Sequence, residues 1–173
     1  IMLLCFKVRP YLAIIGAISF GLSSYNLIGL TAGHNARISA VSFMPLVMGA
    51  VHLCFTRNKI LGASLTALAL AMQLRVNHLQ ITYYLALVIG IYGLIQLIYA
   101  IRDKQVQDYL KRLGLLMAAL VLAIGTFFGE FYATYEYGKY SNRGKSELSQ
   151  QANSEMNDDG LGKTYAFQYS NGI

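Results

Sequence analysis

The sequence predicts an all-α fold, a polytopic bundle of about five transmembrane helices that is truncated at both ends. Of its 173 residues, 55% are hydrophobic and only 13% are charged, whereas soluble domains carry about 25% charged residues. The hydrophobic residues come in long blocks, and the mean hydropathy of the chain is +0.45. This pattern is typical of helices that cross a bilayer, and it disfavours both a disordered chain and an ordinary soluble enzyme.

Five blocks approach the roughly 20 apolar residues that a membrane-crossing helix needs. The third block is the weakest, because it crosses only if the helix continues beyond Leu74 to Asn77 with the Arg75 head group reaching the interface. A re-entrant segment is the alternative for that block. The expected crossings lie near residues 11–30, 38–55, 60–77, 81–101 and 113–131.

Two regions follow from this pattern. Residues 1–131 are expected to form the transmembrane bundle, and residues 132–173 an incomplete segment outside the cytoplasm. Ile1–Phe6 is an apolar run too short to cross, and the chain stops within a polar stretch at residues 170–173. We therefore expect the chain to be a piece of a larger membrane protein.

Positive charge predicts the orientation, because short cytoplasmic loops carry an excess of Lys and Arg. If the five blocks alternate, eight cations fall on one side and only Arg37 and Arg75 lie in the two short loops of the other side. The net charge of +6 does not indicate nucleic-acid binding, since the cations are not gathered in one patch. The sequence predicts a multi-pass membrane protein whose eight-cation side faces the cytoplasm. The eight cations are Lys7, Arg9, Arg57, Lys59, Arg102, Lys104, Lys111 and Arg112.

Polar residues gather on the side opposite these cations, in residues 31–37, 73–84 and 130–143. Polar and ionisable residues beside membrane spans are costly, so their placement is informative. Arginine suits phosphate, and histidine, asparagine and glutamine suit hydroxyl groups. We expect the three segments to form one outward-facing polar surface that binds an anionic head group.

Each of these residues also has a simpler interpretation. His34 and His78 can be interfacial loop residues, and Arg75 can be an anchor at the membrane surface. Glu136 and Lys139 are three residues apart and can pair on one helix face. An aromatic belt is the simpler interpretation of the four tyrosines Tyr132, Tyr135, Tyr137 and Tyr140.

Other site classes lack a pattern in this sequence. Cys5 and Cys54 provide neither a disulfide framework nor a zinc cluster. No spacing supports a Ser-His-Asp arrangement, and no phosphate-binding P-loop is present. We expect no metal ligands among the candidate residues.

Three stretches resemble the YfhO family of bacterial membrane proteins. They are Gly33-His34-Asn35, residues 74–84 (LRVNHLQITYY) and residues 135–144 (YEYGKYSNRG). Residues 160–172 resemble the next outer segment of the same family.

The resemblance implies a GT-C-like fold and a glycosyltransferase activity. Such enzymes take a sugar from a polyprenyl-phosphate carrier and transfer it to an envelope polymer or glycan acceptor on the outer face. The resemblance places the catalytic acid in an outer loop that would precede Ile1, so we expect the chain alone to be inactive. A divalent cation is possible by resemblance, and the expected partners are membrane lipid, the lipid-linked sugar and the acceptor.

The residues assigned to the substrate follow from the resemblance and from the polar surface together. Arg75 or Arg143 is expected to bind the carrier phosphate. Asn35, His78 and Gln80 are expected to face sugar hydroxyls or support the backbone. Two alternatives to the enzyme remain, namely a transporter or flippase for a lipid-linked or anionic solute, and a non-catalytic membrane assembly protein. The full set of candidate substrate-binding residues is His34, Asn35, Arg75, His78, Gln80, Glu136 and Arg143.

Overall fold

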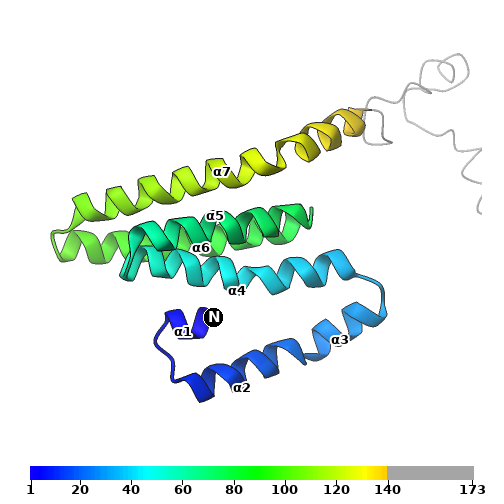
Figure 1. Cartoon of the computed structure of the whole chain (residues 1–173), viewed down its shortest axis with the longest axis horizontal. Helices are drawn as coiled ribbons and strands as arrows, with labels where there is room; N and C mark the ends of the chain where they lie inside the picture. The colour runs from blue at the N-terminus through cyan, green and yellow to red at the C-terminus, as the bar shows by residue number, and fades with distance from the viewer. Residues whose placement is uncertain (140–173) are drawn as a thin grey trace, which may run out of the picture. The chain divides into compact units, whose positions relative to one another are not determined.

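A computed structural model describes residues 1–139, which are helical throughout and contain no β-strand. The chain divides into two units, Ile1–Phe128 and Gly129–Ile173, and the last helix continues from the first unit into the second. Figure 1 shows the order of the helices along the chain. Their bounds are α1 Met2–Cys5, α2 Pro10–Gly21, α3 Ser24–Thr31, α4 Asn35–Thr56, α5 Lys59–Arg75, α6 Leu79–Arg102 and α7 Val106–Lys139.

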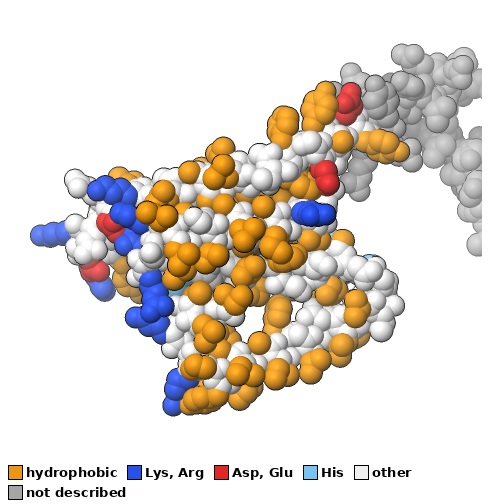
Figure 2. Space-filling view, in the orientation of Figure 1, with side chains coloured by type: hydrophobic (Ala, Val, Ile, Leu, Met, Phe, Trp, Pro, Cys, Tyr) orange, Lys and Arg blue, Asp and Glu red, His pale blue; other side chains and the backbone are white. Residues whose placement is uncertain are grey.

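Four stretches of the described chain are long and apolar enough to cross a membrane. They are Pro10–Thr31, Asn35–Thr56, Leu79–Arg102 and Val106–Gly138, with mean hydropathies between 1.5 and 2.1. Large apolar side chains cover the outside of these helices, as Figure 2 shows. A water-soluble monomer rarely exposes so much apolar surface, so the helices indicate a membrane protein. The predicted number of crossings and their directions remain predictions.

The first predicted crossing, residues 11–30, is not one continuous helix. The helix breaks at Leu22 and Ser23, between α2 and α3. Ser23 adopts an extended conformation as the N-cap of α3, and the Asn26 side chain donates a hydrogen bond to the carbonyl of Phe20 over 2.7 Å. Serine and asparagine compete with helical backbone bonds in this way, and Asn26 adds a short bond to a carbonyl that otherwise accepts only a long one, from the Ser23 N–H over 3.4 Å.

The third block forms α5, which is 17 residues long and spans about 26 Å. The helix ends at Arg75, two residues before the predicted end, because Asn77 adopts a left-handed conformation with φ 53°. Asn58 caps its first turn by accepting hydrogen bonds from the backbone N–H groups of Ile60 and Leu61. Whether α5 crosses the bilayer remains a prediction.

The last helix is longer at both ends than the predicted crossing at residues 113–131. Residues 106–112 and 132–137 contain neither glycine nor proline, so nothing in the sequence interrupts the helix there. As a result α7 begins at Val106 and continues to Lys139.

The core lies where α4, α5 and α6 pack together. Val47 and Val51 of α4 contact Ala69 of α5 and Leu85 of α6, and each of these side chains is at most 2% exposed. The closest approach is between α4 and α5, since a Cβ added at Gly62 would overlap the backbone of Cys54. Small residues allow such contacts between helices in membranes.

The short helix α1 lies between α2 and α4. A Cβ added at Gly16 of α2 would approach Leu3 Cδ1 to 2.7 Å, and one at Gly49 of α4 would approach Met2 Cα to 2.9 Å. Two glycines therefore accommodate α1 from opposite sides.

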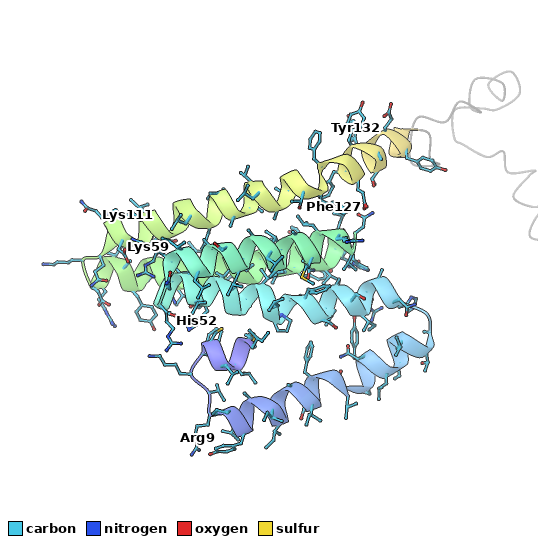
Figure 3. The ribbon with its side chains drawn as sticks, viewed as in Figure 1. Arg9, His52, Lys59, Lys111, Phe127 and Tyr132 are labelled. Carbon is cyan, nitrogen blue, oxygen red and sulfur yellow. The ribbon has the colours of Figure 1, made fainter. Side chains whose placement is uncertain are left out.

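Basic side chains gather at one end of the first unit, at the turns α1–α2, α4–α5 and α6–α7 (Figures 1 and 2). Figure 3 shows Arg9, Lys59 and Lys111 at this end, which we call the basic end. The turns α3–α4 and α5–α6 lie at the opposite end.

Candidate functional site

The two turns opposite the basic end have the same local build. In each, a residue in the left-handed conformation is followed by a histidine that is the N-cap of the next helix. Gly33 (φ 78°) precedes His34 before α4, and Asn77 (φ 53°) precedes His78 before α6. Glycine and asparagine are the residues that most readily end a helix in this conformation. The local sequence thus places both histidines at helix starts.

The first of these turns is closed by backbone hydrogen bonds. The N–H of His34 donates to the carbonyl of Gly29 over 2.9 Å, and the N–H of Gly33 donates to the carbonyl of Leu30 over 3.1 Å. This pair of bonds is the Schellman arrangement, which satisfies the carbonyls of Gly29 and Leu30 with backbone N–H groups.

One open pocket of about 560 Å³ joins the two turns. Four of the predicted substrate-binding residues line it, namely His34, Asn35, His78 and Gln80. We call it the histidine pocket. Its complete lining is Tyr25, Gly33, His34, Asn35, Ala36, Arg37, His78, Gln80, Ile81 and Tyr84.

The pocket carries positive charge with no acidic side chain in its lining. Arg37 is its one formal cation, and among residues 1–139 it makes no salt bridge. The first turns of α4 and α6 both contribute to the wall, and no side chain caps either helix start. Uncapped helix starts present backbone N–H groups and the positive end of the helix dipole. The pocket is therefore suited to an anion.

Tyr25 of α3 holds the guanidinium group of Arg37. Arg37 Nε donates to Tyr25 Oη over 2.5 Å, and the guanidinium carbon lies 4.7 Å from the centre of the Tyr25 ring. Arg37 is not among the substrate-binding residues predicted from the sequence. The available signal was its spacing, because a residue three positions after His34 lies on the same face of the first turn of α4.

The His78 turn rests on buried polar groups. Thr82 Oγ1 donates to the carbonyl of His78, and Gln73 Nε2 donates to Thr82 Oγ1 over 3.4 Å. Gln73 is fully buried. His78 Nδ1 is buried without a hydrogen-bond partner among the described residues. Because buried polar atoms are nearly always paired, this nitrogen is available to a ligand or a water molecule in the pocket.

Gln80 and Tyr84 form a second pair on the α6 side of the pocket. Gln80 Nε2 donates to Tyr84 Oη over 2.8 Å, one helical turn away. The bond orients the Gln80 carboxamide at the pocket wall.

Three further residues were assigned to the substrate from the sequence. Arg75 is exposed at the last turn of α5 and is not part of the pocket lining. Glu136 is exposed on α7 in the second unit. Arg143 lies outside the described residues. Their assignment to the substrate remains a prediction.

Residues 1–139 form no cluster of side chains suited to a metal ion. No group of three or more His, Cys, Asp or Glu side chains in the described part of the chain is placed to hold one. The divalent cation allowed by the resemblance thus has no ligand set among residues 1–139.

A smaller polar pocket of about 130 Å³ lies at the basic end, and its charges are paired. Asp108 contacts Arg112 over 2.5 Å and Lys59 over 3.7 Å, and Arg112 Nη1 donates to the carbonyl of Cys54 over 2.6 Å. These bonds connect the start of α7 to α4 and α5, so the arrangement is a structural brace between helices.

Comparisons with known protein families, curated proteins and solved structures find no match to this chain.

Proposed function

We propose that the chain is part of an integral membrane glycosyltransferase that takes a sugar from a polyprenyl-phosphate carrier. The observation that carries the proposal is the meeting of two distant stretches in one pocket. Gly33-His34-Asn35 and His78-Leu79-Gln80 are separated by α4 and α5, yet both line the histidine pocket. These are also two of the stretches that resemble the YfhO family.

The chemistry of the lining supports a sugar-phosphate head group. Asn35 and Gln80 carry carboxamides that both donate and accept hydrogen bonds, as sugar hydroxyls require. His34 and His78 can do the same through their ring nitrogens. In this proposal these residues bind and orient the sugar. The resemblance implies that an acidic residue of another outer loop acts as base or metal ligand.

The distribution of charge supports an outward-facing pocket. The basic end carries the turns rich in Lys and Arg, which tend to stay in the cytoplasm. The histidine pocket lies at the opposite end of the first unit. We propose that this end faces the outside of a bacterial cytoplasmic membrane, where the acceptor is an envelope polymer or glycan, and that residues 132–173 are extracytoplasmic.

A transporter or flippase is the second candidate, and the break between α2 and α3 favours it. Transporters form their binding sites at discontinuous membrane helices. Here the break carries Asn26, which is 8% exposed and whose Oδ1 has no hydrogen-bond partner among the described residues. The lipid-linked or anionic solute would then pass this break.

Sugar transfer by the full-length parent protein tests the proposal. Membranes containing the protein are incubated with a radiolabelled sugar on polyprenyl phosphate, and label in envelope polymer is measured. We expect Asn35→Ala and Gln80→Ala to lower transfer about tenfold each, since each removes a hydrogen-bonding group from the pocket. Gln107→Ala is the matched control, because Gln107 is exposed at the basic end.

Two results would overturn the proposal. One is the absence of transfer from a broad set of sugar donors by folded, abundant protein. In that case movement of the lipid-linked sugar across the membrane is measured instead, which tests the transporter. The other is equal transfer by the pocket variants and the Gln107→Ala control.

A further inference from the structure

We infer that Arg37, positioned by Tyr25, binds the phosphate group of the ligand in the histidine pocket. Arg37 was not among the residues assigned to the substrate from the sequence. The inference rests on the proposed function for the identity of the phosphate-bearing ligand, and it adds the residue that recognises the charge.

Arg37 carries a positive charge that no acidic side chain in residues 1–139 pairs. Every other formal charge in the two pockets belongs to the basic end, where Asp108 pairs with Arg112 and Asp103 pairs with Arg102. Arg37 has no acidic neighbour in its pocket and no salt bridge within residues 1–139. A cation held without a partner beside an apolar span is costly. A bound anion removes that cost.

Tyr25 fixes the orientation of the Arg37 guanidinium group. Tyr25 Oη accepts from Nε, and the Tyr25 ring lies under the guanidinium group. The two terminal nitrogens of Arg37 make no hydrogen bond to residues 1–139. Their N–H groups form a fork that matches two oxygens of a phosphate. Tyr25 is therefore a positioning residue, since it fixes the side of the fork that remains open.

The pocket holds other polar groups besides Arg37 that suit a phosphate. The uncapped starts of α4 and α6 add backbone N–H groups, a recurrent setting for phosphate. His78 Nδ1 adds a buried atom without a partner in the described chain. The α5 start at the basic end differs, because Asn58 already accepts from its N–H groups. The starts of α2 and α3 also lack a side-chain cap, so the open helix starts add donors to the pocket, and Arg37 is what distinguishes it.

Binding of three probes to the purified full chain in lipid nanodiscs tests the inference. The probes are a polyprenyl monophosphate, the same polyprenol without phosphate, and inorganic phosphate. We expect the polyprenyl monophosphate to bind and Arg37→Ala to weaken it by about 10- to 100-fold, the range for a lost hydrogen bond to a charged group. Arg37→Lys should lose less, since the charge remains.

Tyr25→Phe separates positioning from folding. It keeps the ring under the guanidinium group and removes only the hydroxyl acceptor, so we expect binding about threefold weaker. The helical circular dichroism of each variant is compared with that of the unchanged chain. A loss of phosphate binding by Tyr25→Phe in a protein with unchanged helix content supports positioning.

Arg75→Ala is the competing variant, because the sequence also assigns the phosphate to Arg75, which belongs to the same end of the first unit but not to the pocket lining. A larger loss with Arg75→Ala than with Arg37→Ala would overturn the inference. So would equal binding of the polyprenol and its monophosphate. Inorganic phosphate distinguishes the sources. Competition at similar concentrations indicates a free anion as ligand, and weak competition indicates a phosphate carried on a lipid.

The outcomes for this inference and for the proposed function are separable. Phosphate binding that depends on Arg37, together with no sugar transfer by the parent, supports the inference and contradicts the glycosyltransferase. Sugar transfer by the parent, with unchanged phosphate binding by Arg37→Ala, supports the enzyme and overturns the inference.

Discussion

The two ends of the first unit treat charge in opposite ways. At the basic end Arg112 is bound by Asp108 and by the Cys54 carbonyl, and Asn58 caps the start of α5. In the histidine pocket Arg37 has only the neutral Tyr25, and the starts of α4 and α6 have no side-chain cap. Paired groups connect helices to each other, whereas groups left open are available to a ligand. The difference supports the proposal that the histidine pocket binds a ligand while the basic end is structural.

The largest expected effect on stability comes from substitutions at the helix contacts near each end of the first unit. Gly62→Ala places a Cβ into the Cys54 backbone, so α4 and α5 must separate. We expect a destabilisation of about 3 kcal/mol, at the upper end for overpacking. Gly29→Ala meets only the tip of the Ile38 side chain, which can rotate, so its cost should stay below about 1.5 kcal/mol. Unfolding of the purified protein in detergent compares the two variants, and equal losses would contradict a tighter contact at the basic end.

The next largest effects concern Arg112 and Arg37. We expect Arg112→Ala to lower stability and Arg37→Ala to lower polyprenyl monophosphate binding. Arg112→Ala leaves the buried Cys54 carbonyl without its partner, at a cost of about 1–3 kcal/mol, while loss of the exposed Asp108 pair adds little. Arg37→Ala removes the hydrogen bond and ring contact to Tyr25 of α3, but these are exposed, so we expect a stability loss of less than about 1 kcal/mol. Thermal unfolding and polyprenyl monophosphate binding are measured on both. A stability loss with Arg37→Ala matching that of Arg112→Ala would erase the contrast between the ends.

The left-handed turn residues give the smallest effect. Gly33→Ala adds a Cβ in the left-handed conformation, and Asn77→Ala replaces a residue that tolerates this conformation with one that does not, at about 1 kcal/mol each. Asn77→Gly retains the conformation and should be close to neutral. Since His34 and His78 follow these residues directly, ligand binding should weaken with the alanine variants and survive in Asn77→Gly. Binding that is unchanged in both alanine variants would show that the turns do not set the histidine positions.

The sequence predicted the helices well because apolar blocks are long and local. It missed the break at Leu22 and Ser23, which depends on a hydrogen bond from Asn26 back to Phe20. It also extended the third helix past Arg75, since hydropathy does not register the left-handed conformation at Asn77. Both differences are backbone events decided by single polar residues.

The candidate site was predictable in part. The loops that hold His34, Asn35, His78 and Gln80 were predicted to lie on the same side of the membrane. All four residues line one pocket. Arg37 was not selected because its value depends on two facts that a sequence does not contain, the contact with Tyr25 and the absence of an acid nearby in the lining. Arg75 has the same charge and lies in the same class of loop, so composition alone did not rank the two.

The small helix α1 sets the spacing of the helices around it. Its residues Met2 and Leu3 touch Gly49 of α4 and Gly16 of α2, so three segments must come together at once. During synthesis α1 and α2 are complete before Gly49 exists, and α1 reaches its final place only when α4 has formed. The spacing of α2 from α4 therefore depends on α1, and a larger side chain at Gly16 or Gly49 would displace it.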